Sequence, residues 1–266
     1  MFYETHKHYT KMKEGKLMLH NGLSQEERVR FIENLELCDT PEALRSVCEG
    51  AGDSSASVDA GTVASFVNNV SGQSKSDVLN SMLLAQLAAT KQHDPENDPV
   101  NWYAFYKTVL GNIGWVIESF GFNKFEASSA TIDLGDVIIN LVAAIATDNE
   151  LKAIMAAIKA LRALARTSSP GRIFDTSSHS SSAGNFRIAA CAEHAGGVST
   201  TISSSYFSST ETVTSIFWSK FSSSDMQLYY STQTIHLNQD IYKTVRQQVI
   251  NKLGDRASQY IAELEI

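Results

Sequence analysis

The chain contains few cysteines. Among its 266 residues there are three, Cys38, Cys48 and Cys191. An odd and sparse set does not build a disulfide framework, so we expect free thiols and synthesis in the cytoplasm. Cys38 and Cys48 are ten residues apart with no matching histidine cluster, which makes a zinc site improbable, and we predict no metal site.

Long apolar runs are also missing. The apolar stretch from Val137 to Ala146 is interrupted by Asn140, whereas a membrane-spanning helix needs about 20 apolar residues. The N-terminus, MFYETHKHYTKMKEGK, is basic and aromatic but lacks the apolar core of a secretory signal. We therefore expect a protein made in the cytoplasm, without a permanent membrane span, that acts elsewhere only after release.

Positive charge is scarce as well. Charged residues make up 19% of the chain, and the net charge is −7. Binding to nucleic acid needs concentrated Lys and Arg, so nucleic acid is not expected as a general partner. Local basic stripes are still compatible with an acidic protein.

Signatures of known catalytic sites are absent too. The sequence has no G-x-S-x-G elbow, no phosphate-binding glycine loop and no H-E-x-x-H. Its paired carboxylates lie at expected helix starts and in loops, where solvation explains them. We therefore predict no catalytic residues, no dissociable cofactor and no enzymatic activity.

The most informative segment that is present covers residues 134–166. Two apolar helical blocks meet at the polar break Thr147-Asp148-Asn149-Glu150. In the second block Lys152, Lys159 and Arg166 recur every seven residues and form one stripe, with Arg162 at its margin. Such a pair of helices either packs into the core with its basic edge in solvent, or presents a surface that binds anionic lipid.

The chain before residue 134 is expected to be helical. The capping box Ser24–Glu27 predicts a helix over 25–37, and Pro41 at a first helical position predicts another to about 49. Periodicity and caps predict further helices over 58–70, from Ser76 to about 92, and over 101–122. The last carries Trp102, Tyr103 and Trp115, which are either core residues or membrane-interface residues.

After residue 166 the composition changes. Residues 167–225 contain eighteen serines and only seven charged residues. Residues 176–184 lack a hydrophobic pattern and are expected to form a mobile loop, and a closing helix is expected over 239–263. Alternation then predicts antiparallel strands near 186–193, 197–207, 211–221 and 226–236.

These elements define an α+β fold. We expect the helical half and the apolar helical pair to pack on a C-terminal antiparallel, Ser/Thr-rich sheet of about four strands. The domain divisions are an irregular lead-in over 1–22, a small helical subdomain over 23–93 and a main α/β domain over 99–266. The turn-rich segment HDPENDP at 93–99 marks the boundary, and one continuous domain is the alternative.

Cys191, in RIAACAEHAGG, is the best candidate for a special site. One interpretation is a small buried core thiol, since free cysteine is among the most buried residue types. The other is a thiol facing an apolar pocket that holds an acyl chain as a thioester. A strand places Cys191 and Glu193 on one side and His194 on the other, so a Cys–His nucleophilic pair is geometrically awkward.

The order of parts resembles the Erwinia virulence factor family and related insect-directed bacterial proteins. The residues that carry this resemblance are Trp102-Tyr103, Tyr106, Gly114-Trp115-Val116 and Cys191. The resemblance spans about residues 75–266. It implies a mixed α/β protein that has no known enzymatic activity and associates with membranes, and it implies a covalent fatty acyl group on Cys191.

Three functions follow as hypotheses. The first is a non-enzymatic virulence or insecticidal factor that binds anionic membrane lipid, with Trp102, Tyr103, Trp115, Lys152, Lys159, Arg162 and Arg166 as contact candidates. It could oligomerise on the membrane or form pores, through either the helices or the serine-rich strands. The second is a cytosolic adaptor or immunity-type protein. The third is a small enzyme that uses Cys191, Glu193 and His194.

Overall fold

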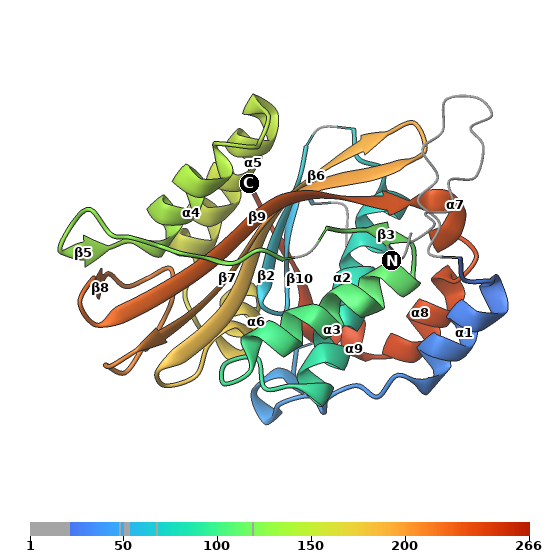
Figure 1. Ribbon diagram of the computed structural model, residues 1–266, viewed down its shortest axis with the longest axis horizontal. Coiled ribbons are helices and arrows are strands. Elements are labelled where there is room, and N and C mark those ends of the chain that lie inside the picture. The colour runs from blue at the N-terminus through green and yellow to red at the C-terminus, as the bar shows by residue number, and fades with distance from the viewer. Residues whose placement is uncertain (1–21, 48, 51–53, 68, 119) are drawn as a thin grey trace, which may run out of the picture.

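The computed structural model describes residues 22–266 except 48, 51–53, 68 and 119. The expected lead-in over 1–22 therefore lies outside the described residues, apart from Gly22. Within them the chain is α+β, as the sequence predicts. One central sheet has helices on both of its faces (Figure 1).

The elements follow one another along most of the chain with short connections. The helices are α1 (Gln25–Asn34), α2 (Gly72–Gln92), α3 (Pro99–Asn112), α4 (Leu134–Val142), α5 (Asp148–Ala163), α6 (Ser169–Ser178), α7 (Gln239–Tyr242), α8 (Arg246–Leu253) and α9 (Arg256–Tyr260), with a 3-10 turn η1 (Glu42–Leu44). The strands are β1 (Ala56–Asp59), β2 (Thr62–Phe66), β3 (Trp115–Val116), β4 (Asn123–Lys124), β5 (Thr131–Ile132), β6 (Ala183–His194), β7 (Gly197–Ser209), β8 (Phe221–Ser222), β9 (Met226–Asn238) and β10 (Ile261–Leu264).

The main sheet is mixed and has eight strands among the described residues, instead of the expected four antiparallel ones. Its order is β10-β1-β2-β6-β7-β9-β3, with β4 also paired to β9. Among the described strands, only β2 and β6 run parallel to each other. The three strands predicted near 186–193, 197–207 and 226–236 are confirmed as β6, β7 and β9, the long strands at the centre of Figure 1.

The helix expected over 58–70 is wrong, because this segment is the hairpin of β1 and β2. Ala60 and Gly61 make its two-residue turn, and Ala60 has a φ of +49°. Both strands are buried on both faces. A short apolar run buried on both faces shows no alternation, so periodicity alone does not separate it from a helix.

Several other boundaries also differ from the prediction. The helix from residue 41 to 49 is reduced to η1, and α2 begins after Ser71 instead of Ser76. The helix over 101–122 ends at Asn112, because Gly114 has a φ of +112° and the chain then enters β3. The HDPENDP segment is a turn between α2 and α3, as expected.

The second half contains three further corrections. Residues 176–184 are not a loop, because α6 and the start of β6 occupy most of them. Residues 211–220 do not join the sheet; there Phe217 instead stacks on Phe174 of α6, with ring centroids 5.2 Å apart. The closing helix is broken into α7, α8 and α9, and Gly254, with a φ of +54°, follows α8.

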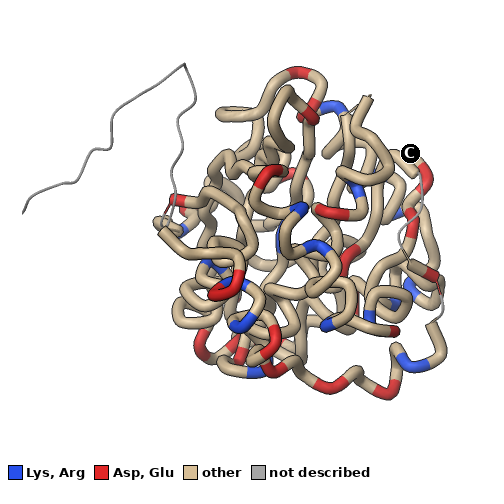
Figure 2. Tube along the Cα trace, turned by 90° about the vertical axis from the view of Figure 1, so that its right-hand side faces the viewer, with Lys and Arg blue, Asp and Glu red and all other residues tan. Residues whose placement is uncertain are grey.

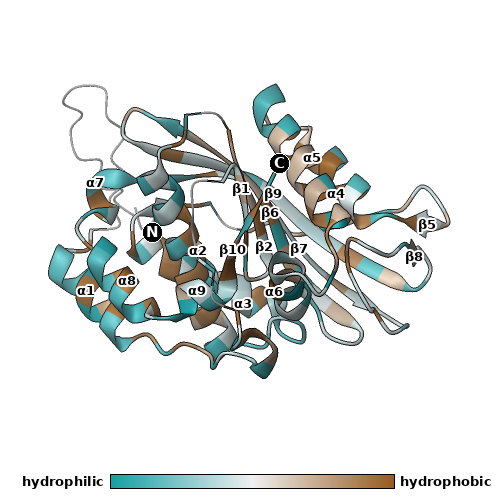
Figure 3. Ribbon diagram, turned by 180° about the vertical axis from the view of Figure 1, so that it is seen from behind, coloured by the Kyte–Doolittle hydropathy of each residue, from teal (hydrophilic) through white to brown (hydrophobic). Residues whose placement is uncertain are grey.

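The two faces of the sheet carry different helices. Strand alternation places Arg187 and Cys191 of β6 on one face, where the Arg187 guanidinium lies 4.8 Å from the Trp102 ring centroid in α3. Thr200 pairs with Cys191, so Thr201 points to the other face, and its hydroxyl donates to Glu150 of α5. Helices α4 and α5 lie side by side there, and α2 and α3 cover the Arg187 face (Figures 1 and 3).

The apolar helical pair of residues 134–166 is confirmed as α4 and α5. Thr147 caps α5, and the side chain of Glu150 accepts from the Thr147 backbone N–H, which completes a capping box. The polar break is therefore a helix start. Arg162 of α5 pairs with Asp133, the residue that caps α4, so the two helices are joined by charge as well as by apolar contact.

Candidate functional site

Cys191 lies in the centre of the sheet. In β6 it is in register with Phe66 of β2 and Thr200 of β7, and none of its surface is exposed. The Thr200 hydroxyl donates to its Sγ over 3.3 Å. Burial raises the pKa of the Cys191 thiol to about 12. A thiol in this state is a poor nucleophile, and a reagent reaches it only if the surrounding layers separate.

Among the described residues, the side chains of Cys191, Glu193 and His194 are not hydrogen-bonded to one another. Glu193 binds the start of α2, whereas the Nε2 of His194 lies 2.8 Å from the Ser199 hydroxyl. The Cys191 thiol instead accepts a hydrogen bond from the Thr200 hydroxyl. These hydrogen bonds therefore join β6 to β7 and cap the start of α2.

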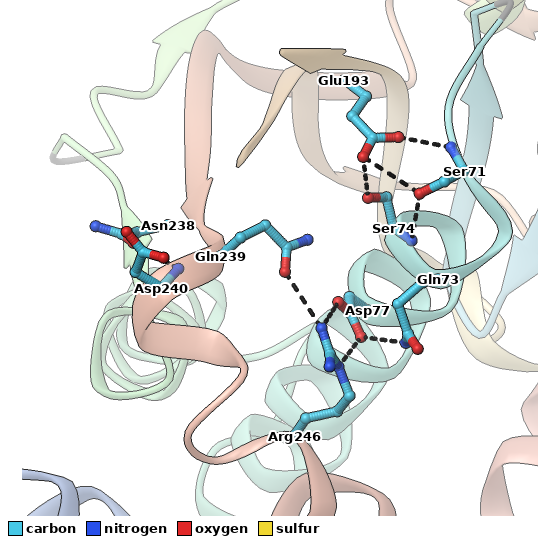
Figure 4. Close-up of polar contacts among 9 residues, drawn as sticks. All are labelled: Ser71, Gln73, Ser74, Asp77, Glu193, Asn238, Gln239, Asp240 and Arg246. Atoms are coloured by element: carbon cyan, nitrogen blue, oxygen red, sulfur yellow. Dashed lines mark hydrogen bonds and ion pairs between the residues drawn. The ribbon is translucent and has the colours of Figure 1, made fainter. Parts of the chain in front are cut away.

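Glu193 has a clear structural role (Figure 4). Its carboxylate accepts hydrogen bonds from the Ser71 backbone N–H at 2.6 Å and from the Ser74 hydroxyl at 2.8 Å. Burial acts to raise the pKa of Glu193, but these hydrogen bonds, with one from the Ser71 hydroxyl, outweigh it and lower the pKa. A carboxylate at a helix N-terminus satisfies unpaired N–H groups and opposes the helix dipole.

The same close-up shows the buried ion pair between Asp77 and Arg246. The Nε and Nη2 of Arg246 donate to the two carboxylate oxygens of Asp77, each over 2.7 Å. The Asp77 side chain is 1% exposed and that of Arg246 is 28% exposed. This bidentate pair ties α8 to α2.

The aromatic membrane-contact candidates lie in the core. Trp102, Tyr103 and Trp115 are each at most 3% exposed. Their polar atoms have partners inside the protein: Trp102 Nε1 donates to the Thr90 hydroxyl, Trp115 Nε1 to Ser81, and the Tyr103 hydroxyl to Asn185. In this folded form they contact protein, and a membrane reaches them only if α3, which carries Trp102 and Tyr103, or β3, which carries Trp115, leaves its place in the fold.

The basic candidates of α5 fall into two groups. Arg162 pairs with Asp133, and Arg166 pairs with Asp175 and donates to the Thr214 carbonyl. Lys152 and Lys159 are exposed, and no acidic partner is found for either among the described residues. The stripe of four cations thus leaves two lysines available to a partner.

These two lysines flank an exposed methionine. Lys152, Met155 and Lys159 lie at helical spacing on one face of α5, and Met155 is 47% exposed. Ile145, in the turn before α5, is 41% exposed. We call Lys152, Met155 and Lys159 the outer face of α5. It combines apolar and basic side chains, although Asp148 at the first turn opposes the positive charge.

The outer face of α5 and the aromatic segment of α3 lie on opposite faces of the sheet. A flat lipid surface therefore contacts one of them at a time. Over the part of the chain that the structure describes, no helix combines the length and hydropathy needed to cross a bilayer. The same residues contain no group of three His, Cys, Asp or Glu side chains placed to hold a metal ion.

A buried polar cluster around Arg187 was not anticipated from the sequence. Arg187 is 2% exposed, and its guanidinium donates to the Thr62 hydroxyl, the Asn185 carboxamide and the Gln86 carboxamide. Among the described residues it forms no ion pair. The only signal in the sequence is a lone arginine in the apolar strand FRIAAC, because its partners come from distant segments.

Asp59 faces the same side of the sheet, since it pairs with Thr62 and Thr62 pairs with Arg187. It is fully buried, and neither carboxylate oxygen has a hydrogen-bond partner among the described residues. Burial raises the pKa of Asp59 well above its usual value of 3.8, although the charge of Arg187 lowers it. The carboxyl group is therefore a source of pH-dependent instability.

We expect Asp59→Asn to stabilise the fold by about 1–3 kcal/mol at neutral pH. The folded state binds the Asp59 proton more tightly than the unfolded state does, so this contribution to stability is full below pH 3.8 and is lost as pH rises through the raised pKa. The advantage of the asparagine variant should thus grow from pH 4 to pH 8. Urea unfolding across this range measures it, and a constant or reversed difference would contradict the assignment.

The fold and these contacts define an α+β protein with a mixed sheet enclosed by helices. No protein-family model and no curated protein matches the sequence. Among solved structures, that of the Evf virulence factor is similar, with a TM-score of 0.31 and 11% sequence identity, over 89% of this chain and 91% of that chain. This is a weak structural resemblance to a virulence factor.

Proposed function

We propose that this chain is a non-enzymatic bacterial virulence or insecticidal factor that binds the anionic lipid of host membranes after its release. The observation that carries the membrane part is the outer face of α5, where Lys152 and Lys159 flank the exposed Met155. The virulence part comes from the family resemblance of the sequence.

The proposed contact is peripheral. Lysines near an anionic surface contribute about 1 kcal/mol each, and an exposed methionine between them enters the headgroup boundary. The chain carries a net charge of −7, so its overall field opposes approach to such a surface. Acidic and basic positions are interspersed over the view in Figure 2, and binding therefore depends on how α5 is oriented.

The test is vesicle flotation with the double variant Lys152→Gln/Lys159→Gln. Removing two lysines should weaken binding to phosphatidylserine-containing vesicles by about thirtyfold, which corresponds to about 2 kcal/mol. The matched control is Lys91→Gln/Lys124→Gln, which removes two exposed lysines outside α4 and α5 that, among the described residues, have no acidic partner either. The proposal is contradicted if both double variants bind anionic vesicles equally well. It is also contradicted if the unchanged protein binds neutral vesicles as well as anionic ones.

A fatty acyl group on Cys191 is a further part of the proposal. Because the thiol is fully buried between Phe66 and Thr200, acylation would have to precede folding or accompany opening of the layers. The intact mass of protein isolated from its native host tests this. An unmodified mass, or normal function of Cys191→Ser, would count against the acyl group.

The same vesicle experiments separate the alternatives. A complete absence of binding to any lipid composition would favour the cytosolic adaptor or immunity-type protein. Leakage of vesicle contents would favour pore formation, by the helices or by the serine-rich strands. The latter route requires β6, β7 and β9 to leave a sheet in which each is paired on both sides. Oligomers on the membrane would appear in crosslinking only after lipid is added.

A further inference from the structure

A half-enclosed pocket opens beside the Arg187 cluster. Its volume is about 190 Å³. Segments far apart in the sequence line it: the β1–β2 turn, α2, the loop after α2, the end of α6, the start of β6 and the segment after α1. Arg187 and Asn185 are among the polar residues that line this pocket, and Leu87, Trp102 and Tyr260 are among those that offer apolar surface.

Arg187 brings to this pocket a positive charge that forms no ion pair among the described residues, because the nearby Asp59 carboxyl has a raised pKa and no hydrogen bond to it. Its Nε, Nη1 and Nη2 donate to Thr62, Asn185 and Gln86, at 2.9, 2.8 and 2.6 Å. All three acceptors are neutral, and each terminal nitrogen carries a second N–H for another acceptor. A buried cation is costly unless an anion pairs with it, and guanidinium is suited to carboxylate.

The guanidinium is also held in place. Gln86 Nε2 donates to the Asp59 carbonyl and Asn185 Nδ2 to the Pro95 carbonyl, so both amides turn their oxygens toward Arg187. A Cβ added at Gly61 would lie 2.6 Å from Arg187 Nη2, which shows how closely the turn packs against it. A fixed cation with pre-positioned neighbours binds an anion without first having to be ordered.

The rest of the pocket restricts the charge of the ligand. Glu96 and Asp39 line it and oppose multiply charged anions, whereas His179 is held by the Asp175 carboxylate and the Ser180 carbonyl. Leu87, Trp102 and Tyr260 offer apolar contact for a ligand body. Because Asp175 already pairs with His179, Arg187 is the lining cation left for a ligand, and beside two carboxylates and apolar side chains it fits a monoanion better than a phosphate.

We propose that this pocket binds a small organic monocarboxylate, with its carboxylate on Arg187 and its apolar body against Trp102, Leu87 and Tyr260. The site goes beyond the proposed membrane contact. It faces the α2–α3 side of the sheet, opposite the outer face of α5. A soluble ligand therefore reaches it independently of lipid.

Isothermal titration of the full chain with phenylacetate tests the proposal. 2-Phenylethanol is the neutral control of similar size, and inorganic phosphate is the anionic control without an apolar body. We expect one phenylacetate per chain, with binding at least about tenfold tighter than that of the alcohol or of phosphate, because hydrogen bonds from a guanidinium to a carboxylate are stronger than those to a neutral hydroxyl, and phosphate lacks the apolar body. A branched short-chain acid, 3-methylbutanoate, should also bind.

Two variants locate the binding. Arg187→Met replaces the buried cation with an apolar side chain and should abolish the preference for acid over alcohol. Thr176→Trp fills the mouth from an exposed position of α6 and should weaken binding at least about tenfold. Thr167→Trp, at an exposed position before α6, is its matched control.

The Thr176 variant keeps the test valid if Arg187→Met does not fold. The proposal is overturned if neither acid binds, if the alcohol or phosphate binds as tightly as phenylacetate, or if Thr176→Trp leaves binding unchanged. Equal affinity of a folded Arg187→Met variant would mean that Arg187 only connects the strands and helices around it.

Discussion

Arg246→Met is expected to lower the free energy of unfolding by about 3–5 kcal/mol. The substitution leaves the Asp77 carboxylate, which is 1% exposed, with Gln73 as a hydrogen-bond donor and without its ion-pair partner. Removing one partner of a buried pair strands the other charge in the protein interior. The same substitution removes the ion pair that connects α8 to α2. Urea unfolding followed by circular dichroism measures the loss.

An exposed pair in the same chain provides the control. Arg45 and Glu42 are 62% and 84% exposed and form an ion pair within one turn. Glu42→Gln should cost less than about 1 kcal/mol, because water already screens this pair. If Arg246→Met and Glu42→Gln have equal effects, the Asp77–Arg246 pair does not hold the two helices together.

Trp102→Ala is expected to lower the free energy of unfolding by a similar amount, about 3–5 kcal/mol. Trp102 is 2% exposed, its ring stacks on Tyr106 with centroids 5.2 Å apart, and the Arg187 guanidinium lies over the Trp102 ring, 4.8 Å from its centroid. The substitution leaves a cavity and removes the donor to Thr90. Thermal unfolding in the absence of lipid measures the effect.

Val100→Ala, on the same helix, is the control. Val100 is 60% exposed, so its truncation should change stability by less than about 0.5 kcal/mol. The two variants also separate core from membrane roles for the aromatic segment. A Trp102→Ala protein that stays stable but no longer binds vesicles would contradict the buried placement of Trp102.

Local signals in the sequence predicted local structure well. The predicted capping box Ser24–Glu27 starts α1, and the segment predicted as a polar break at Thr147–Glu150 is a second capping box, which starts α5. The strands β6, β7 and β9 were predictable because their alternation of side chains is also a local pattern. Each is long enough for a two-residue period to stand out.

Non-local pairing was beyond the sequence. The β1–β2 hairpin resembles a helix by periodicity, and only its parallel contact with β6 and its antiparallel contact with β10 make it a strand pair. β10 lies at the end of a segment that was expected to be helical. No sequence pattern near Ile261 indicates that this segment will pair with β1. Expectations about 58–70 and 261–264 were wrong because tertiary context overrides local propensity.

The candidate sites show the same division. The seven-residue spacing of Lys152 and Lys159 was enough to predict that they share one face, because both lie on the same helix. The Arg187 cluster needed the fold, since Thr62, Gln86 and Asn185 come from separate elements. Burial of Cys191 was one of two open interpretations, and the structure places it in the centre of the sheet.

We propose that the outer face of α5 binds the lipid surface. A solvatochromic dye tests it most directly, attached through Met155→Cys or, as the control on the opposite face, through Thr108→Cys of α3, in a background with serine at positions 38 and 48. We predict that anionic vesicles shift the emission of the dye at position 155 to the blue and leave the dye at position 108 unchanged. A shift at position 108 alone, or at neither position, would contradict the claim.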